Sequence, residues 1–442
     1  MTSRTETTTH GRFIALVLGV ALGVSLLVAL INTIIDPFGI YGSTALPRIN
    51  AYKPAMQNRV RLVKAFDVRH IKPRALILGT SRSHLAIRTT HPGWDPVAQP
   101  RYNLAFDGAT THEMYAYLRH AHAITPLRQV ILGLDTWHLN PFPSGVRPGF
   151  DEALLDAPAN SWRYFTSRLA SLRIAFSADT AWASIQTLLA QDDPQPIWFA
   201  PDGQRLGEVF FHRPGEEFAV SGPSNYFWAI DRQEAGFKLD MGDDRPHRGT
   251  ADAAPDMASL EYVRLIIEFC RAEGIDLRLY ITPAHAHQME ISSAVGEWPA
   301  IEAGKRDLVK SLDEDIETHP GAKPFVFYDF SGYSSVTTET VPTRGGSQEM
   351  SFYWDSSHFK EAIGDCILDR LFATQRAGQP CPPDFGVALT PGAIEEVIVQ
   401  IRAQRARYRE KHADDAAQIL TMVSEVWNSL TPRRRKPISN AE

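Results

Sequence analysis

A single apolar run near the N-terminus constrains this chain more than any other feature. Residues 13–35 hold 23 consecutive residues without a charged side chain, and only Ser25, Asn32 and Thr33 among them are polar. About 20 helical residues, each rising about 1.5 Å, cross a hydrocarbon core of roughly 30 Å, so this run is long enough to span a membrane. The sequence therefore predicts one transmembrane helix at residues 13–35, preceded by a cytoplasmic tail at residues 1–12.

The main alternative for this run is a cleaved signal peptide. The apolar part of a signal peptide usually holds about 7–15 residues and ends at a small-x-small cleavage site. Here the run is longer and ends in Ile34-Ile35-Asp36-Pro37, which contains no such site. We therefore expect an uncleaved, single-pass anchor in the lipid bilayer.

The orientation of this anchor rests on charges close to the span. Arg4 and Arg12 precede it, and Arg48 and Lys53 are the basic residues within 20 positions of its exit. More distant basic residues carry little weight, because long domains cross membranes largely regardless of charge. We expect a short cytoplasmic tail and an exported C-terminal domain.

Short apolar runs alternate with helical patterns through the rest of the chain. Strands are predicted at residues 75–78, 130–134, 277–282 and 325–328, and helices at 111–123, 257–273, 300–314 and 360–374. Buried strands that alternate with helices are typical of an α/β fold, in which a mostly parallel sheet carries helices on both faces. Such a domain is predicted over residues 74–376.

Three other segments differ from this pattern. Residues 36–73 are predicted as a juxtamembrane connector. Residues 140–255 are rich in Pro, Gly, Trp and Asp, and are predicted as an insertion with one helical stretch near 162–189. Residues 377–442 are predicted as a helical C-terminal tail.

Charge and cysteine content narrow the class of protein. The chain has 45 Lys and Arg against 51 Asp and Glu, a formal net charge of −6, which excludes a generally basic nucleic-acid binder. We expect no nucleic-acid partner and no cofactor. Cys270, Cys366 and Cys381 lack metal-knuckle spacing and allow at most one disulfide, so the redox compartment stays open.

The segment Gly79-Thr80-Ser81-Arg82-Ser83 directly follows the first predicted strand. A serine at a strand-to-helix turn is exposed at the carboxyl edge of the sheet, where α/β folds place their sites. Its backbone N–H, at the start of the helix, points toward an anion that forms there. Ser81 is therefore a candidate nucleophile; the alternative is an ordinary helix cap.

A second motif, Trp354-Asp355-Ser356-Ser357-His358, comes just before the last helix of the sheet region. Asp355 and His358, three residues apart on a tight turn, can face the same cavity. His358 can then act as general base to a serine while Asp355 orients its imidazole. The alternative is a capping Asp355 beside an unrelated histidine.

The order of these motifs resembles the SGNH (GDSL-like) hydrolase and acyltransferase superfamily. The resemblance covers roughly residues 75–373 and implies a three-layer, flavodoxin-like fold. It also implies that Ser81 is the nucleophile, that Asp355 and His358 complete the triad, and that the Ser81 N–H and Gly108 form the oxyanion hole. Thr80 stands where the superfamily often has Asp.

One position departs from the pattern of that superfamily. Its Gly-x-Asn block reads Gly133-Leu134-Asp135 here. An ionised Asp135 cannot donate a hydrogen bond to an oxyanion and would repel it. Three explanations are open: Asp135 is protonated, Asp135 has another role, or Asn103 or Asn140 supplies the donor.

The resemblance also implies a function. Membrane-anchored bacterial members resemble alginate-type O-acetyltransferases, and others resemble the protein that helps to D-alanylate teichoic acid. The implied activity is transfer or hydrolysis of O-acyl groups on an exported or cell-envelope polysaccharide at the bacterial cytoplasmic membrane. The acyl donor and the carbohydrate acceptor are not identified, and a membrane-embedded partner is expected to supply the donor. Aromatic residues of the insertion are candidates for stacking on sugar rings: Trp162, Trp182, Trp198, Tyr226, Phe227 and Trp228.

Two other functions compete with this one. His285 and His287 follow the third predicted strand, and with Asp355 could bind zinc, although a lone His-x-His is a weak signal and no metal is expected. His285 could instead contact the substrate. A catalytically silent assembly or polymer-binding factor would also fit the anchor and fold, and Asp135 favours it.

Overall fold

A computed structural model of the chain describes residues 3–139, 144–155, 162–192, 194, 197–240, 257–376, 378 and 380–430. It contains two compact units, one made of Met1–Lys72 and Gly149–Ile197 and the other of Pro73–Pro148 and Trp198–Glu442. The helices and strands are α1 (Ser3–Ile35), α2 (Ala55–Asn58), α3 (Val60–Ile71), β1 (Ala75–Leu78), α4 (Ser81–Ala86), β2 (Arg101–Asn103), α5 (Thr111–Ile124), β3 (Gln129–Leu134), η1 (Thr136–Leu139), η2 (Glu152–Leu154), α6 (Trp162–Ala175), α7 (Ala178–Leu189), α8 (Gly207–His212), α9 (Glu217–Ser221), α10 (Pro223–Asp240), α11 (Ser259–Ala272), β4 (Asp276–Ile281), α12 (Ala286–Ala294), α13 (Trp298–Thr318), β5 (Val326–Asp329), α14 (Glu361–Phe372), β6 (Val387–Ala388), α15 (Ile394–Lys411) and α16 (Ala413–Ser429).

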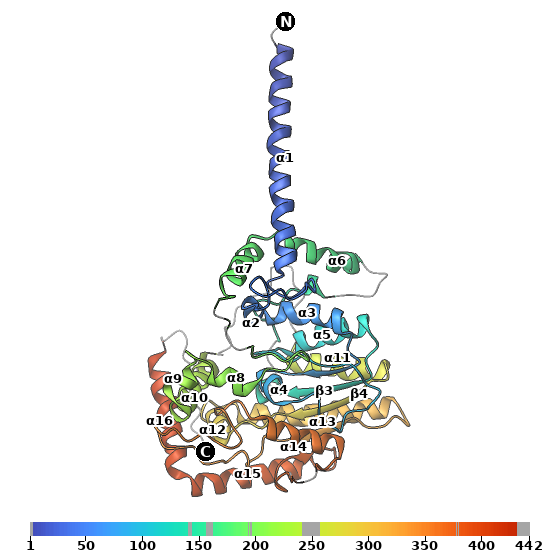
Figure 1. Cartoon of the computed structure of the whole chain (residues 1–442). Helices are drawn as coiled ribbons and strands as arrows, with labels where there is room; N and C mark the ends of the chain where they lie inside the picture. Colours follow the sequence, from blue (N-terminus) through green and yellow to red (C-terminus); the bar gives the residue numbers. More distant parts are fainter. Residues whose placement is uncertain are drawn as a thin grey trace. The chain divides into compact units, whose positions relative to one another are not determined.

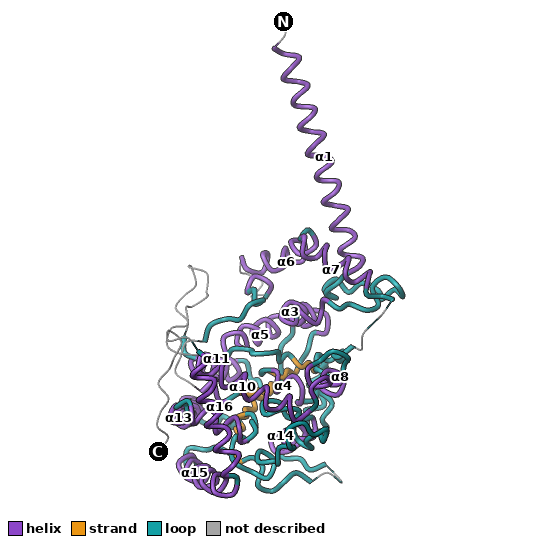
Figure 2. Tube along the Cα trace, turned by 90° about the vertical axis from the view of Figure 1, so that its left-hand side faces the viewer, coloured by secondary structure: helices purple, strands orange, loops and turns teal. Residues whose placement is uncertain are grey.

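The first unit is built on the apolar helix α1. Its part His10–Ile35 is long and apolar enough to cross a membrane, and it alone among the described helices is so. Most of its large apolar side chains are exposed, for example Leu18 at 64% and Leu22 at 61%. Near its C-terminal end it contacts α6 and α7 (Figures 1 and 2). The predicted span is thus one continuous helix.

The second unit contains a six-stranded sheet in the order β2-β1-β3-β4-β5-β6. Strands β1 to β5 are parallel, and β6 is antiparallel to β5. Every residue of β1 and β3 is buried, which requires cover on both faces of the sheet. The predicted mostly parallel α/β fold is therefore confirmed.

The helices form two layers around this sheet. Helix α11 contacts α5 and α13, whereas α4 contacts α14. Figure 1 shows α5 and α11 on one side of β3 and β4, and α14 on the other. The order 2-1-3-4-5 is that of doubly wound sheets that bind ligands between the ends of β1 and β3, where the direction of winding reverses.

Several predicted elements match the structure and others differ. The four predicted strands correspond to β1, β3, β4 and β5, but β2 and β6 were not predicted because they are short and lack an apolar run. The predicted helical tail contains two helices, α15 and α16, separated at His412. Residues 140–255, predicted as one insertion, are divided between the two units.

The chain contains one disulfide among the described residues. Cys366 of α14 is bonded to Cys381, with their Cα atoms 5.5 Å apart, and Cys270 is a buried free thiol. The pair connects α14 to the segment that leads into β6.

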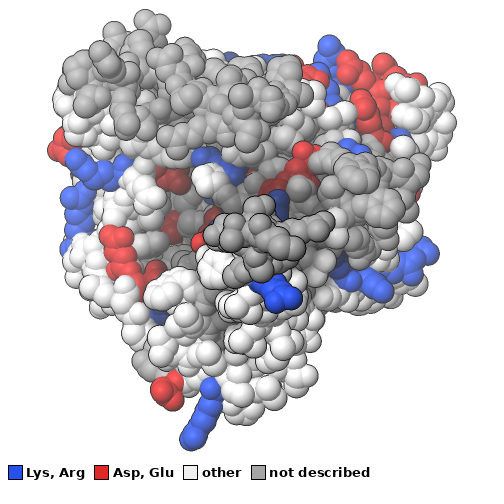
Figure 3. Space-filling model, turned by 90° about the horizontal axis from the view of Figure 1, so that it is seen from above, with Lys and Arg blue, Asp and Glu red and all other residues white. Residues whose placement is uncertain are grey.

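Figure 3, seen from the N-terminal end of α1, shows how charge is distributed on that face. Among the described residues drawn there, both basic and acidic side chains are present on this face.

Candidate active site

Ser81 lies at the carboxyl end of β1 as the first residue of α4. Thr80 caps this helix, since its hydroxyl accepts the backbone N–H of Arg82 at 3.4 Å. Gly79 adopts φ +155°, and a Cβ there would lie 2.2 Å from the Ser83 hydroxyl, so only glycine fits the turn. The local sequence thus places Ser81 at the point where the winding of the sheet reverses.

The side chains of Ser81, His358 and Asp355 form one hydrogen-bonded chain. Ser81 Oγ lies 2.8 Å from His358 Nε2, and His358 Nδ1 lies 2.8 Å and 3.0 Å from the two Asp355 carboxylate oxygens. Because the carboxylate can only accept, Nδ1 carries the proton and Nε2 is free to accept from the serine hydroxyl. This is the arrangement of a nucleophile, a base and the carboxylate that orients the base.

The turn that carries Asp355 and His358 is stabilised locally. Asp355 is fully buried, and its Oδ1 accepts the backbone N–H groups of Ser357 at 2.7 Å and His358 at 2.9 Å. The backbone N–H of Trp354 donates to the carbonyl of His358 at 2.9 Å and closes the turn. A spacing of three residues therefore positions the carboxylate and the imidazole together.

The environment of His358 favours its protonated form. Burial would lower the pKa of the imidazole, but the charge of Asp355 and its hydrogen bond outweigh burial and raise the pKa above its ordinary value of 6.5. The side chain remains 20% exposed, so a substrate can approach it. The site can thus stabilise an imidazolium when the base takes a proton.

Asp135, at the end of β3, lies in a buried polar network. Its Oδ2 accepts from Thr80 at 2.8 Å and from Trp137 at 3.1 Å, and its Oδ1 accepts from Thr282 at 2.7 Å. Burial would raise the pKa of Asp135, but the Arg82 guanidinium at 3.0 Å and these hydrogen bonds lower it to about 2. Asp135 is therefore ionised and faces donors. Of the three explanations for this position, the structure assigns it another role, not that of an oxyanion donor.

Arg82 was not predicted as a site residue, yet its side chain contacts both Asp135 at the end of β3 and Ser357 in the turn before His358. Its Nη1 pairs with Asp135, while its Nε donates to the carbonyl of Ser357 at 2.8 Å and its Nη2 to the hydroxyl of Ser357 at 2.7 Å. The side chain is 7% exposed. An arginine beside a serine gives no sequence signal for such a role, because its partners come from distant segments.

Gly108 lies in the turn that follows β2. It adopts φ +57°, and the turn is tied to the Ser81 strand because the backbone N–H of Phe106 donates to the carbonyl of Gly79 at 3.2 Å. Among the described residues, no acceptor takes the backbone N–H of Gly108 or of Ser81. Two backbone donors in the loops after β1 and β2 thus remain available to an anion.

The other predicted contact residues have different roles or lie outside the described part. Asn103 donates its amide to the carbonyls of Ser83 at 3.1 Å and Ile87 at 3.0 Å, and so stabilises α4. His285 Nε2 donates to the carbonyl of Glu339 at 2.8 Å. Asn140 lies outside the described residues.

The two histidines considered for zinc point to separate partners. His285 Nδ1 accepts the backbone N–H of His287, and burial with the nearby His287 lowers the pKa of His285 well below its ordinary value. His287 Nδ1 lies 2.7 Å from the buried carboxylate of Asp231. In the described part of the chain, no three His, Cys, Asp or Glu side chains gather as metal ligands.

An aromatic cluster lies beside His358 and was not predicted. It is formed by Phe211 of α8, Phe218 of α9 and Trp354, with the Phe211 and Trp354 rings stacked at 4.8 Å. The Phe211 centroid lies 6.3 Å from that of His358. Helices from the second half of the predicted insertion thus form an apolar wall next to the base.

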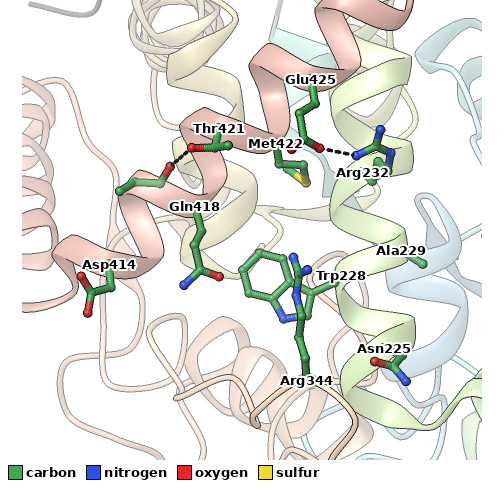
Figure 4. Close-up of a pocket in the computed structure, with 11 residues that line it drawn as sticks. Asn225, Trp228, Ala229, Arg232, Arg344, Asp414, Gln418, Thr421, Met422 and Glu425 are labelled. Carbon is green, nitrogen blue, oxygen red and sulfur yellow. Dashed lines mark hydrogen bonds and ion pairs between the residues drawn. The ribbon is translucent and has the colours of Figure 1, made fainter.

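A cavity of about 750 Å³ lies between α10 and α16, and none of the triad residues lines it (Figure 4). Its lining residues are Asn225, Trp228, Ala229, Arg232, Arg344, Asp414, Ala417, Gln418, Thr421, Met422 and Glu425. The Arg344 guanidinium stacks on the Trp228 ring at 4.3 Å, and Arg232 pairs with Glu425 at 3.0 Å. Of the other aromatic residues named for sugar stacking, Trp198 and Phe227 are buried in the core, and the Trp162 side chain lies outside the described part.

No protein-family model matches the chain, and no curated protein matches its sequence.

Proposed function

We propose that the protein is a membrane-anchored serine acyltransferase or esterase that acts on O-acyl groups of an exported or cell-envelope polysaccharide. The observation that carries this proposal is the hydrogen-bonded chain from Ser81 through His358 to the buried Asp355. A serine nucleophile with a base and an orienting carboxylate is the arrangement for acyl transfer through a covalent intermediate. The resemblance to the SGNH superfamily supports the same chemistry.

The reaction follows from these positions. Ser81 Oγ attacks the carbonyl carbon of the acyl donor while its proton passes to His358 Nε2. The tetrahedral intermediate collapses, the donor's ester oxygen leaves with the proton from Nε2, and the acyl group stays on Ser81. An acceptor hydroxyl then gives its proton to Nε2 and attacks the acyl-serine, and Ser81 leaves with that proton.

Two groups assist this sequence. The backbone N–H groups of Ser81 and Gly108 donate to the oxyanion in each tetrahedral intermediate. Asp355 holds the imidazole in the correct tautomer and stabilises the imidazolium. Transfer and hydrolysis share the acyl-enzyme and differ in whether a sugar hydroxyl or water attacks it.

The cavity on α10 and α16 supports a carbohydrate acceptor. The partly exposed Trp228 ring carries the Arg344 guanidinium on one side, and the exposed side chains of Arg344 and Gln418 have no hydrogen bond to the described residues. Aromatic rings beside such donors suit the apolar faces and hydroxyls of sugars. We expect Trp228→Ala to raise the oligosaccharide concentration needed for half-maximal transfer, while hydrolysis of a small ester stays unchanged.

The anchor and the disulfide support an exported location. Helix α1 is long and apolar enough to hold the chain at a membrane. The Cys366–Cys381 bond suits an oxidising compartment, because disulfides rarely persist in the bacterial cytoplasm. We therefore propose that the domain faces the outer side of the cytoplasmic membrane, where a membrane-embedded partner would supply the acyl donor.

The alternative, a catalytically silent assembly factor, was favoured by Asp135 alone. Asp135 has partners of its own in the network with Arg82, so its presence does not imply a broken oxyanion hole.

Labelling with a serine-directed fluorophosphonate tests the proposed function. The full chain in detergent is expected to be labelled on Ser81, and Ser81→Ala is expected to lose the label. Ser351→Ala, which changes an exposed serine, serves as the matched control. A folded wild-type protein that stays unlabelled would instead favour the silent factor.

A further inference from the structure

The two helices beside α1 have an inverted pattern of polarity. On α7, the buried side chains are small or polar, and the large apolar side chains are exposed, beside the exposed polar residues Asp179 and Gln186. The buried set is Thr180, Ala183, Ser184 and Thr187, whereas Trp182, Ile185 and Leu189 are 59%, 47% and 74% exposed. A helix on a water-facing surface normally shows the reverse arrangement.

Helix α6 and the residue that follows it repeat this inversion. Leu169, Leu172 and Phe176 are 59%, 55% and 46% exposed, while the small residues Ala170 and Ala175 are buried. These apolar positions are spaced three and four residues apart, so they share one face, on which the exposed Arg173 also lies. Contiguous apolar faces of this kind mark contact with a partner or a membrane.

The buried faces of these helices contact α1 through polar groups. Ser184 Oγ donates to Asn32 Oδ1 at 2.9 Å, and Asn32 Nδ2 donates to the carbonyl of Ala175 at 2.8 Å. Small residues and hydrogen-bonded polar side chains are typical of contacts between helices inside membranes. The polar atoms therefore pair with one another and leave the apolar side chains facing outward.

The position of these contacts along α1 indicates how deep in a membrane they lie. They involve the last two turns of the apolar helix, where Asn32 and Ile35 are buried and Ile31 and Ile34 remain 43% and 49% exposed. A run of 26 residues is about 39 Å long, whereas the hydrocarbon core is roughly 30 Å thick, so its last turns reach the headgroup boundary. In Figures 1 and 2, α6 runs across the axis of α1 at this end.

We propose that α6 and α7 lie in the membrane interface next to α1, with their exposed apolar faces among the lipid acyl chains. The occupant of this surface is lipid, because the surface continues the apolar surface of α1. Two charged pairs lie among the described side chains here, Arg173 with Asp151 at 2.6 Å and Arg59 with Asp179 at 3.7 Å. The exposed apolar side chains of both helices make apolar burial the driving force of this contact.

Spin labels on the full chain in phosphatidylcholine vesicles test this proposal. Labels are attached at Leu172→Cys and Leu189→Cys, with Val399→Cys on α15 as the control because Val399 is 61% exposed. Cys270 is buried and the other two cysteines are bonded, so the new thiol takes the label. The ratio of collisions with oxygen, which dissolves in lipid, to collisions with a water-soluble nickel complex is expected to be several-fold higher at positions 172 and 189 than at 399.

Two other outcomes would overturn the proposal. Equal ratios at all three positions would mean that water covers the apolar faces. Low collision rates with both reagents at 172 and 189 would mean that a second copy of the chain covers them.

Discussion

At the scale of single residues, Arg82 determines how the proposed triad is held. Its guanidinium reaches the end of β3 through Asp135 and the His358 turn through Ser357. The planar fork of arginine makes these contacts together, which a lysine ammonium cannot do. The residue beside the nucleophile therefore fixes the distance between serine and base.

The variant Arg82→Lys tests whether the site needs the hydrogen-bonding geometry of the guanidinium or only its positive charge. The lysine keeps a positive charge for Asp135 but loses the two hydrogen bonds to Ser357, which contribute about 1 kcal/mol each to the free energy of unfolding. We expect kcat for p-nitrophenyl acetate to fall on the order of 10²-fold, because the base is misplaced, with little change in KM. Arg88→Lys, two residues beyond the end of α4, is the control; equal kcat in the two variants would contradict this role.

The pH dependence of the reaction follows from His358. Only the neutral imidazole accepts the serine proton, and its pKa is raised above 6.5. We expect kcat/KM to fall as the pH drops through that pKa and to level off above it.

Asp355→Asn should reduce kcat on the order of 10⁴-fold, because the imidazole loses its orienting carboxylate. Rates of nitrophenol release between about pH 6 and 9 measure both effects, and a flat wild-type profile would exclude His358 as the base.

Residues that are close in sequence were the most predictable part of the site. Asp355 and His358 share one turn, so their spacing alone indicated that they act together. The ionised state of Asp135 was not predictable, because it depends on Arg82 and Thr282, which come from other segments. The role of Asn103 was not predictable either, because its amide donates to carbonyls of α4 and of the residue that follows this helix.

At the scale of elements, the position of Ser81 depends on how closely α14 packs on α4. A Cβ at Gly364 would lie 1.9 Å from the carbonyl oxygen of Ala86. The two helices therefore approach each other at a distance that only glycine permits. Since α4 begins at Ser81, any shift of this helix moves the nucleophile.

Gly364→Ala tests this dependence. We expect it to lower the free energy of unfolding by about 1–3 kcal/mol through overpacking and to slow acylation of Ser81. Gly236→Ala, in the interior of α10, meets its nearest atom at 3.7 Å and should stabilise the protein by up to about 1 kcal/mol. Urea unfolding monitored by circular dichroism compares the two variants; equal stabilities would contradict the close packing.

Helices and strands with a long apolar pattern in their own sequence could be predicted, whereas short elements without one could not. Strands β1 and β3 are continuous apolar runs, whereas β2 has three residues and β6 has two, and both pair only because neighbouring strands are in place. The polarity of α7 is visible in its sequence, but which of its faces is buried depends on α1.

At the scale of the whole molecule, the disulfide reports the compartment in which the chain folds. Cys366 and Cys381 lie 15 residues apart, and a bond that closes a loop of this size contributes about 3 kcal/mol to stability. Of the three cysteines, two therefore form a disulfide that a reductant can open, and the third is a buried thiol.

Thiol counting after denaturation therefore tests the proposed location. Protein extracted from bacterial membranes and denatured without reductant is expected to react with maleimide at Cys270 alone, and Cys270→Ser should then react at no site. Modification of all three cysteines in the wild type would indicate that the domain folds in the reducing cytoplasm.

The most direct test of the central claim is the intact mass of the full chain during reaction with p-nitrophenyl acetate. The wild type is expected to carry a transient acetyl adduct that maps to Ser81, and the adduct should disappear faster when an acceptor oligosaccharide is added. Ser81→Ala should carry no adduct, and His358→Gln should acylate far more slowly. An adduct that persists in Ser81→Ala, or no adduct on a folded wild-type chain, would contradict the proposed serine chemistry.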